Sequence, residues 1–515
     1  MSVLTFSDLG KRKESVVLII SVFIAGLCSI IYELLIGTTS SYFLGDSVKQ
    51  FSLTIGFYMA AMGIGSYISR FINKNLLVQF IGFEILLGFL GGISVPVLYL
   101  AFAYTDMFYA FKTGFIISIG ILIGLEVPLL TRLLDKYYAL KVNISNILSL
   151  DYFGALIATL LFPFILLPFL GTFKSSLFFG LVNMMIGFIN LWAFSEEIQI
   201  SKKKTLYLFS ILVTVLLGFT LLSSNVLVKH WHDVAYEDRV VYSKQSQYQS
   251  IVLTKNKDDV RLFLNGSLQF SSIDEYRYHE SLVHTPFATN RIIKSVLVLG
   301  GGDGLAIREL LKYPSVERIV LVDLDPLITE LGKNNPHVKK LNEDSLFNEK
   351  VTILNQDAFV YLKDTNEVFD LVISDLPDPN NVSLARLYSL EFYKYLEKKI
   401  SRTGLFVTQA TSPFYAKETF WCIDRTIRKT SVKYTYPFHV NVPSFAEWGF
   451  ILGSKIPLNL DDMVMKTDDT KFLNQQALEK SFIFEKDIIS DKNNYSSLET
   501  PAVLTYYLDE WKYWN

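Results

Sequence analysis

The stretch VLVLGGGDG, residues 296–304, decides the fold that the sequence predicts. Its first four residues are apolar without alternation, which is typical of a strand buried on both faces of a parallel sheet. The glycines that follow carry no Cβ atom, so the backbone can turn sharply and approach a ligand closely. Helical spacing resumes over residues 305–311. The order of strand, glycine turn and helix predicts a nucleotide-binding βαβ unit.

Acidic residues follow the next predicted strands of this sheet. Buried strands are predicted over residues 319–322, 351–354 and 369–374, and a fifth over 404–409. Because the carboxyl ends of parallel strands meet at one edge of a sheet, we expect the residues that follow them to share a site. The candidate acids are Asp303 in the glycine turn and, at the strand ends, Asp323, Asp357, Asp375 and Asp378.

The positions of these acids predict what each could bind. Asp323 lies about twenty residues beyond the glycines, where an acid accepts hydrogen bonds from ribose hydroxyls. Asp357 lies where an adenine amino group commonly finds an acceptor. Asp303, Asp375 and Asp378 remain, and a negative pocket beside a nucleoside suits a cationic co-substrate such as a diamine. An ammonium ion is not a nucleophile, so Asp375 or Asp378 would have to take its proton before it attacks.

Length and composition predict more than one domain. The chain has 515 residues, of which 50% are hydrophobic and 19% charged, and this composition indicates a membrane part. The net charge of −2 gives no indication of nucleic-acid binding. We predict a multi-pass helical domain over residues 1–227, a small β-domain over 228–290, which contains a predicted β-meander ending at the Asn265-Gly266 turn, and an α/β domain over 291–515.

The first half contains seven apolar stretches long enough to cross a bilayer, a count with an error of one. They cover residues 15–37, 50–69, 76–103, 110–134, 150–170, 174–195 and 205–226. Four acids interrupt these stretches, namely Glu33, Glu84, Glu126 and Asp151. A carboxylate at membrane depth is costly, so these acids would line a path for a cation such as an amine. The alternative is that Glu33 and Asp151 lie at the interface and bond to neighbouring helices. The first stretch is too long for a signal peptide and reads as an anchor.

Basic residues between the stretches predict an orientation. If the stretches alternate, one side receives Lys11, Arg12, Lys13, Arg70, Lys74, Arg132, Lys136, Lys141, Lys202, Lys203 and Lys204, and the other receives Lys49, Lys112 and Lys174. The positive-inside rule then places the amino terminus in the cytoplasm. Seven spans would put the second half outside the cell, although its nucleoside co-substrate is made inside. We expect a cell-membrane protein whose catalytic domain is cytoplasmic.

The glycine turn and its neighbours resemble the spermidine synthase (polyamine aminopropyltransferase) family, in its multi-pass membrane form. The resemblance covers about residues 245–455. It is carried by the turn at 300–304 and by Arg308-Glu309, Asp375-x-x-Asp378-Pro379, Tyr248-Gln249 and Tyr278-His279-Glu280.

The resemblance implies a Rossmann-like domain, similar to that of S-adenosylmethionine methyltransferases, that transfers an aminopropyl group from decarboxylated S-adenosylmethionine to an amine such as putrescine. Asp375 would be the proton acceptor, and Tyr278 would help to orient the amine. His279, Asp303 and Asp378 would hold the polyamine together with Asp375. The nucleoside would be held by Gln249, Gly300, Gly302, Asp323, Asp357 and Ala358. The sulfonium already activates the carbon, so alignment and a base suffice and no metal is expected.

The sequence departs from the family pattern at two places. Leu376 and Pro377 separate the aspartates where relatives have small residues, and Asn380-Asn381 replaces a Gly-Pro pair. Phe445 stands where the family has a tyrosine near the amine, although Tyr434 and Tyr436 are close in sequence. The choice of amine therefore stays open.

Two other functions remain open from the residues. A methyltransferase could use the same fold, although it would not obviously need acids at 303, 375 and 378. A polyamine transporter or sensor could bind the nucleoside without turnover, although Asp375 with Tyr278 argues against it. Partners other than the small molecules and the bilayer are not predicted, and a homodimer is compatible with the sequence. Two cysteines, Cys28 and Cys422, predict neither a disulfide nor a metal site.

Overall fold

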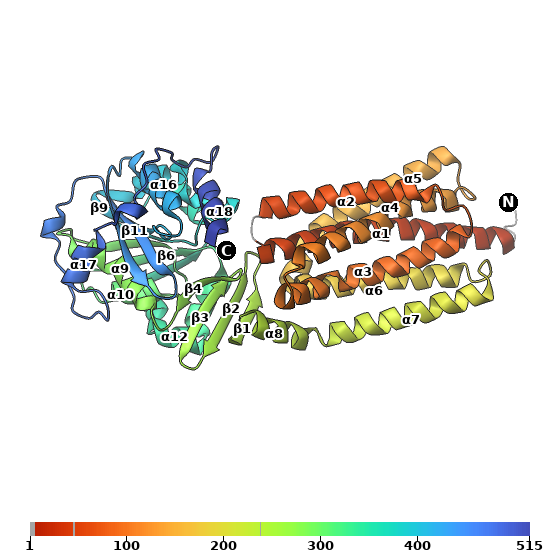
Figure 1. Ribbon diagram of the computed structural model, residues 1–515, viewed down its shortest axis with the longest axis horizontal. Coiled ribbons are helices and arrows are strands. Elements are labelled where there is room, and N and C mark those ends of the chain that lie inside the picture. Colours follow the sequence, from red (N-terminus) through yellow and green to blue (C-terminus); the bar gives the residue numbers. More distant parts are fainter. Residues whose placement is uncertain (1–5, 45–46, 237, 515) are drawn as a thin grey trace. The chain divides into compact units, whose positions relative to one another are not determined.

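The computed structural model describes residues 6–44, 47–236 and 238–514. The side chains of residues 6–12, which include Lys11 and Arg12, and those of residues 232, 233 and 235 lie outside that description. The chain forms two compact units, Met1–Val240 and Val241–Asn515 (Figure 1). We call them the helical unit and the α/β unit.

Long helices build the helical unit and lie side by side along a common direction (Figure 1). They are α1 (Phe6–Leu44), α2 (Ser47–Ser69), α3 (Leu76–Tyr104), α4 (Phe108–Leu134), α5 (Leu140–Leu161), the π-turn η1 (Phe162–Leu166), α6 (Leu167–Ala193), α7 (Ile200–Leu222) and the short α8 (Ser224–Ala235). Six helical stretches among the described residues are long and apolar enough to cross a membrane. One of the six, Leu140–Ala193, has 54 residues and contains α5, η1 and α6.

This longest stretch bends at Gly171, whose backbone is not helical (φ 68°, ψ 179°). After the bend, α6 runs antiparallel to α3. The Thr172 hydroxyl lies 3.1 Å from that of Tyr99, near the end of α3, and Asn183 Nδ2 donates to Glu84 Oε2, near its start, at 3.4 Å.

Before the bend, α5 runs in the same direction as α1. Tyr137, just ahead of α5, donates to Glu14 Oε2 at 2.7 Å, and Gly154 of α5 packs against Phe23, which lies further along α1 than Glu14. Helix α1 runs in the same direction as α3, and the carboxyl-terminal ends of the two helices meet where Phe43 contacts Tyr99. Because α5 follows the direction of α1 and α6 runs against α3, the helices before and after Gly171 have opposite directions. If the stretch that bends at Gly171 is counted as two, the described residues of this unit contain seven apolar helical segments, which we call legs.

Glycines allow the closest helix contacts in this unit. A Cβ built on Gly65 of α2 would lie 2.1 Å from the Ile121 carbonyl oxygen, and one built on Gly124 of α4 would lie 2.1 Å from that of Met62. The backbones of α2 and α4 therefore come into direct contact, because glycine has no side chain to separate them.

Two acids of the bundle are buried and two are half-buried. Glu84 and Glu126 are 1% and 3% exposed, whereas Glu33 and Asp151 are partly accessible. Within the described ranges, no lysine or arginine lies at ion-pair distance from any of the four, and the buried Lys112 Nζ donates to Gln50 Oε1 at 2.7 Å. The amine path stays a prediction.

The α/β unit begins with a four-stranded sheet in the order β1-β2-β3-β4. Its strands are β1 (Arg239–Gln245), β2 (Ser250–Asn256), β3 (Asp259–Leu264) and β4 (Ser267–Ser271). Strands β2, β3 and β4 pair antiparallel, as the Asn265-Gly266 turn requires.

The second sheet has seven strands in the order β10-β11-β9-β8-β5-β6-β7. They are β5 (Ser295–Gly300), β6 (Arg318–Asp323), β7 (Val351–Asn355), β8 (Phe369–Asp375), β9 (Ile400–Gln409), β10 (Tyr434–Val442) and β11 (Ala446–Ser454). The five strands from β9 to β7 are parallel to one another, and β11 and β10 extend the sheet antiparallel. The chain runs from β5 outward through β6 to β7 and then returns to β8, so the topological switch point lies between β5 and β8, where ligands bind in such sheets.

Helices cover both faces of this sheet. They are α9 (Glu275–Ala288), α10 (Leu305–Leu311), α11 (Pro326–Asn334), α12 (Pro336–Asn342), α13 (Ala358–Asp364), α14 (Val382–Ala385), α15 (Leu390–Leu396), α16 (Lys417–Arg428), α17 (Gln475–Ser481) and α18 (Ala502–Trp514). Val296 and Val298 belong to a core with α9 and α10, whereas Leu297 and Leu299 belong to a core with α13, α15 and α16. Burial on both faces explains the absence of polar alternation in β5.

We expect Gly124→Ala to destabilise the helical unit and Gly114→Ala to leave its stability unchanged or raise it. Both glycines lie on α4, but a Cβ at Gly124 meets a carbonyl oxygen and one at Gly114 meets nothing within 4 Å. Overpacking costs about 1–3 kcal/mol, whereas alanine gains up to about 1 kcal/mol in helix propensity. Thermal unfolding of the detergent-solubilised chain measures both. Equal melting temperatures for the two variants would contradict the close α2–α4 contact.

Candidate active site

Asp375 and Tyr278 form the centre of the site at the switch point. Asp375 ends β8, and Tyr278 lies on α9 with 8% of its surface exposed. The Tyr278 hydroxyl donates to Asp375 Oδ1 at 2.6 Å. Burial raises the pKa of the Asp375 carboxyl above its ordinary value, although His279 and the Tyr278 hydrogen bond act in the opposite direction. Two residues that are 97 positions apart in the sequence are thus in direct contact.

The glycine turn leaves the space that Asp375 occupies, because Gly300 and Gly301 have no Cβ atoms. A Cβ on Gly300 would lie 2.0 Å from the Asp375 carbonyl oxygen, and one on Gly301 would lie 2.9 Å from Asp375 Oδ2. Both glycines also have positive φ angles, 79° and 69°. Any larger residue in the turn would displace the carboxylate or strain the backbone.

Asp303 lies at the tip of this turn, within the field of the Asp375 carboxylate. Its Oδ1 accepts from the Leu305 backbone N–H at 2.9 Å, which leaves its other oxygen without a protein donor among the bonds of the described chain. Burial raises the pKa of Asp303 to about 6, with a further increase from Asp375 and a decrease from His279. Asp375 therefore lies close enough to Asp303 to act on its pKa, and the shared binding site of the two acids stays a prediction.

His279 supplies the positive charge beside these acids. Its Nδ1 lies 2.8 Å from Glu275 Oε2, and Glu275 accepts two bonds from the Arg308 guanidinium at 2.9 and 3.0 Å. Burial disfavours the imidazolium, but the bond to Glu275 and its charge raise the pKa of His279 to about 9. The ring is therefore a cation at neutral pH, and it favours the ionised forms of Asp303 and Asp375.

Asp323 and Gln249 lie on the side where the sequence predicts the nucleoside. Asp323 Oδ2 accepts from the Gly302 N–H at 3.0 Å, and Asp323 Oδ1 accepts from Asp325 N–H at 2.9 Å. Burial raises the pKa of Asp323 to about 6. Gln249 Nε2 donates to Asp325 Oδ2 at 3.1 Å, which joins the small sheet to this strand end.

Asp357 has structural partners of its own. It begins α13 as an N-cap, with Oδ1 accepting from Phe359 N–H at 2.8 Å and Val360 N–H at 3.2 Å. Its other oxygen pairs with the Arg386 guanidinium. The following Ala358 is buried. The contact of these two residues with adenine stays a prediction.

Asp378 is held by three neutral donors that the sequence analysis missed. Gln409 Nε2 lies 3.3 Å from Oδ1, and Thr411 Oγ1 and the Tyr507 hydroxyl lie 3.3 and 3.1 Å from Oδ2. Burial raises the pKa of Asp378 to about 6, and these bonds oppose the rise. Gln409 ends β9 at the same sheet edge as Asp375, so the strand-end rule could have found it. No local pattern points from Tyr507 to Asp378.

The hydroxyls near Phe445 do not reach the site. Phe445 packs on Tyr278 with ring centroids 6.3 Å apart. Tyr436, which was close in sequence, uses its hydroxyl to bond both the N–H and the carbonyl of Leu458, at 2.7 and 3.1 Å. Tyr434 is exposed.

The remaining motif residues stabilise the fold. Glu280 accepts from three successive backbone N–H groups, those of Lys471, Phe472 and Leu473, at 2.6 to 2.9 Å. Glu309 accepts from Arg308 and contacts His284, and these partners hold the pKa of Glu309 at about 2 despite its burial. Among the described residues, no cluster of His, Cys, Asp and Glu has the arrangement of a metal site.

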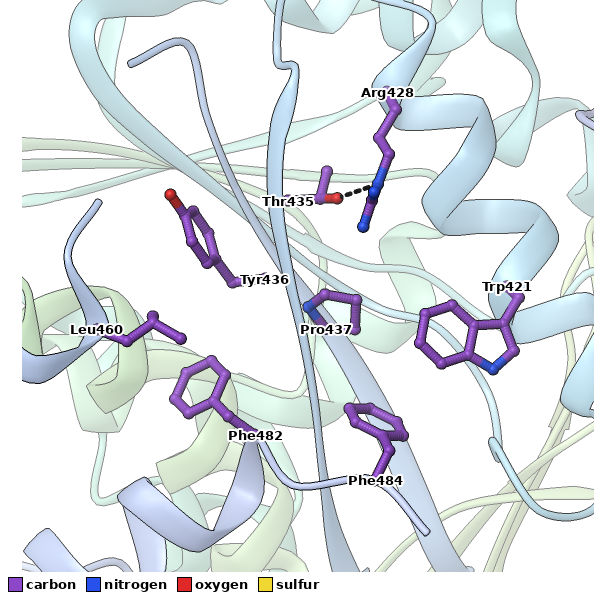
Figure 2. Close-up of a pocket in the computed structure, with 8 residues that line it drawn as sticks. All are labelled: Trp421, Arg428, Thr435, Tyr436, Pro437, Leu460, Phe482 and Phe484. Atoms are coloured by element: carbon purple, nitrogen blue, oxygen red, sulfur yellow. Dashed lines mark hydrogen bonds between the residues drawn. The ribbon is translucent and has the colours of Figure 1, made fainter. Parts of the chain in front are cut away.

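A separate cavity of about 240 Å³ lies at the edge strand β10. Figure 2 shows its lining, which comprises Trp421, Arg428, Thr435, Tyr436, Pro437, Leu460, Phe482 and Phe484. Arg428 Nε donates to Thr435 Oγ1 at 2.6 Å across it. This lining has a guanidinium and no carboxylate, so it does not fit an ammonium ligand, and the acidic site at the switch point does.

We expect the imidazole of His279 to titrate near pH 9 and that of the Glu275→Gln variant to titrate at or below the ordinary 6.5. The raised pKa means that protonation of His279 stabilises the folded chain below about pH 6.5, and that this contribution is lost as the pH rises through about 9. NMR of the histidine rings, assigned with His279→Gln, measures the titration, and Glu317→Gln, on an exposed acid, is the control. An unchanged titration in Glu275→Gln would contradict the pairing.

Comparison with known proteins assigns the family. Residues 275–462 match the spermine/spermidine synthase domain. The chain is 44% identical to the polyamine aminopropyltransferase of Leptospira interrogans over 497 residues, which cover 96% of this chain and 98% of that one. It is 39% identical to polyamine aminopropyltransferase 2 of Ralstonia nicotianae over 508 residues, 97% of this chain and 99% of that one. A crystal structure of spermidine synthase with the transition-state analogue AdoDATO is 28% identical, covers 48% of this chain and 85% of its own, and gives a TM-score of 0.43. The chain therefore belongs to the spermidine synthase (polyamine aminopropyltransferase) family, enzymes that transfer an aminopropyl group from decarboxylated S-adenosylmethionine to a polyamine acceptor.

Proposed function

We propose that the acceptor is a diamine such as putrescine, which yields spermidine and methylthioadenosine, and that Asp375 takes the proton from its attacking ammonium group. The observation that carries this proposal is the 2.6 Å bond from the Tyr278 hydroxyl to Asp375 Oδ1 at the switch point of the sheet. That bond orients Asp375 and leaves its Oδ2 for the amine. Family membership favours aminopropyl transfer over the methyl transfer and the non-catalytic sensor considered above.

The reaction needs one proton transfer and one displacement. The ammonium group gives its proton to Asp375, and the free amine attacks the methylene carbon of the aminopropyl group next to the sulfonium. A C–N bond forms as the C–S bond breaks, and sulfur leaves with the bonding pair as a neutral thioether in methylthioadenosine. The protein supplies alignment and a base, which together can account for several orders of magnitude in rate.

We assign the remaining residues to two halves of the site. Asp303 and Asp378 would hold the ammonium groups of the amine, and His279 would keep the acids ionised while it lines the same pocket. Gln249, Gly300, Gly302, Asp323, Asp357 and Ala358 would hold the nucleoside. The acids of both halves lie at the carboxyl ends of neighbouring strands β5, β6, β7 and β8 or in the loops that follow them.

We also propose that the helical unit spans the cell membrane with its seven apolar legs and that the α/β unit faces the cytoplasm. The length and hydropathy of the legs and the glycine contacts of α2 and α4 support the first part. The supply of the nucleoside inside the cell supports the second. Because seven is an odd number of spans, the amino terminus would then lie outside the cytoplasm. The distribution of basic residues predicts the reverse, a cytoplasmic amino terminus.

We expect Asp375→Asn to lower kcat by at least about 100-fold while the protein still binds the donor, because an amide cannot accept the proton. Mass spectrometry of the products over a panel of di- and triamines measures turnover and identifies the acceptor. Asp364→Asn, on an exposed acid at the end of α13, is the matched control. Undiminished turnover in Asp375→Asn would exclude its role as the base, and release of no methylthioadenosine by the unaltered chain with any amine would exclude the proposed reaction.

Reporter fusions test the orientation. With alkaline phosphatase, which is active only outside the cytoplasm, fused after residue 515, we expect no phosphatase activity, and a green fluorescent protein fused at the same place should be fluorescent. The same reporters placed after residue 222, at the end of α7, should give the same result. Phosphatase activity at both positions would instead place the catalytic unit outside the cytoplasm, and it would agree with the cytoplasmic amino terminus that the positive-inside rule predicts.

A further inference from the structure

The C-terminal helix α18 brings a side chain to the acceptor side of the site. The Tyr507 hydroxyl donates to Asp378 Oδ2 at 3.1 Å, across 129 positions of sequence. Tyr507 lies beyond residues 275–462, which match the family domain. Its ring is half-buried.

Several contacts fix α18 on the α/β unit. Val503 is fully buried in the core that contains α13, α15 and α16. Glu510 accepts from the N–H groups of Glu418 and Thr419 at 2.7 and 3.2 Å, at the amino-terminal end of α16. Trp511 stacks on Tyr415 with ring centroids 5.9 Å apart and an interplanar angle of 15°.

These anchors lie on the same side of α18 as Tyr507. Val503, Tyr507, Glu510 and Trp511 have the spacing i, i+4, i+7 and i+8, which defines one face of a helix. The hydroxyl of Tyr507 is therefore held by contacts on both sides of it along the helix, and it reaches Asp378 from a rigid element.

The donors on Asp378 leave it charged and incompletely satisfied. Gln409 Nε2, Thr411 Oγ1 and the Tyr507 hydroxyl are all neutral, and within the described ranges no lysine or arginine pairs with this carboxylate. A carboxylate has about four acceptor positions, so three donors leave about one free. A cation that binds Asp378 is therefore restricted to one direction.

We propose that Tyr507 is a positioning residue for the amine acceptor and that α18 completes the acceptor half of the site by fixing Asp378. This inference rests on the proposed role of Asp378 in holding the amine. It assigns no contact with the nucleoside to Tyr507, because the acids predicted to hold the donor lie at the ends of β6 and β7. Loss of the hydroxyl should affect the use of the amine and leave the use of the donor unchanged.

The test compares Tyr507→Phe with Tyr506→Phe in the full-length detergent-solubilised chain. Tyr506 is the adjacent residue on α18, and its hydroxyl accepts from Asn494 Nδ2 at 2.6 Å, so the control also loses one hydroxyl and one hydrogen bond. In Tyr507→Phe we expect kcat/KM for the amine to fall about 10- to 150-fold, as loss of a bond to a charged group predicts. The KM for decarboxylated S-adenosylmethionine should stay within about twofold. Tyr506→Phe should leave both values unchanged.

The pH profile gives a readout that a loss of packing would not produce. The Tyr507 bond lowers the pKa of Asp378, so its removal should move the acid limb of kcat/KM for the amine to higher pH. Any of three results would overturn the proposal. The first is an equal loss of kcat/KM for the amine and for the donor, the second is an acid limb that does not move, and the third is the same loss in Tyr506→Phe. If the unaltered chain turns over the amine and Asp375→Asn does not, such a result removes only the role of Tyr507. If the unaltered chain is inactive with every amine, the proposed function itself fails.

Discussion

The site depends on holding several carboxylates together at one sheet edge in a partly buried position. Asp303 and Asp378 both have pKa values raised to about 6 by burial, and the pKa of Asp375 is raised as well. Like charges that are kept from water repel each other, and the fold opposes this repulsion with oriented donors and the imidazolium of His279. A bound ammonium group would offset much of the remaining cost, so the repulsion among these carboxylates favours the binding of a cation. The same environment raises the basicity of Asp375, which favours removal of a proton from that cation.

The charge balance around His279 explains why its imidazolium does not cancel the negative charge of Asp303 and Asp375. Glu275 lies between His279 and Arg308, and Arg308 also contacts Glu309. Lys312 Nζ also lies 3.0 Å from Glu309 Oε2, so the acids Glu275 and Glu309 are paired with cations of their own network. The imidazolium influences Asp303 and Asp375 electrostatically, but its Nδ1 is bonded to Glu275 and not to them. The acids of the site keep their net negative charge for a ligand.

Local patterns in the sequence were sufficient for the parallel strands and for the acids that follow them. The non-alternating run in β5 and the turn after it place Gly300 against Asp375, and strand-end position brings Asp323 and Asp375 to one edge. The gap predicted between residues 170 and 174 also coincides with the bend at Gly171. Tyr507 could not be found in this way, because its place depends on how α18 packs on α16. The engagement of Asp357 as a helix cap and partner of Arg386 was equally invisible, since an N-cap and a ligand-binding acid have the same residue type in the same position.

The segment between Asp375 and Asp378, which departs from the family pattern, is held by hydrogen bonds to its backbone. The Tyr388 hydroxyl lies 3.0 Å from the carbonyl oxygens of both Leu376 and Pro377, and Gln409 Nε2 donates to Leu376 O at 2.6 Å. Leu376 is 8% exposed, so its side chain anchors the loop from the core side. Proline at the next position restricts the backbone further. These contacts constrain the backbone between Asp375 and Asp378, and with it the separation of the two carboxylates. For the diamine acceptor that we propose, the distances between these carboxylates would then favour one chain length of the amine.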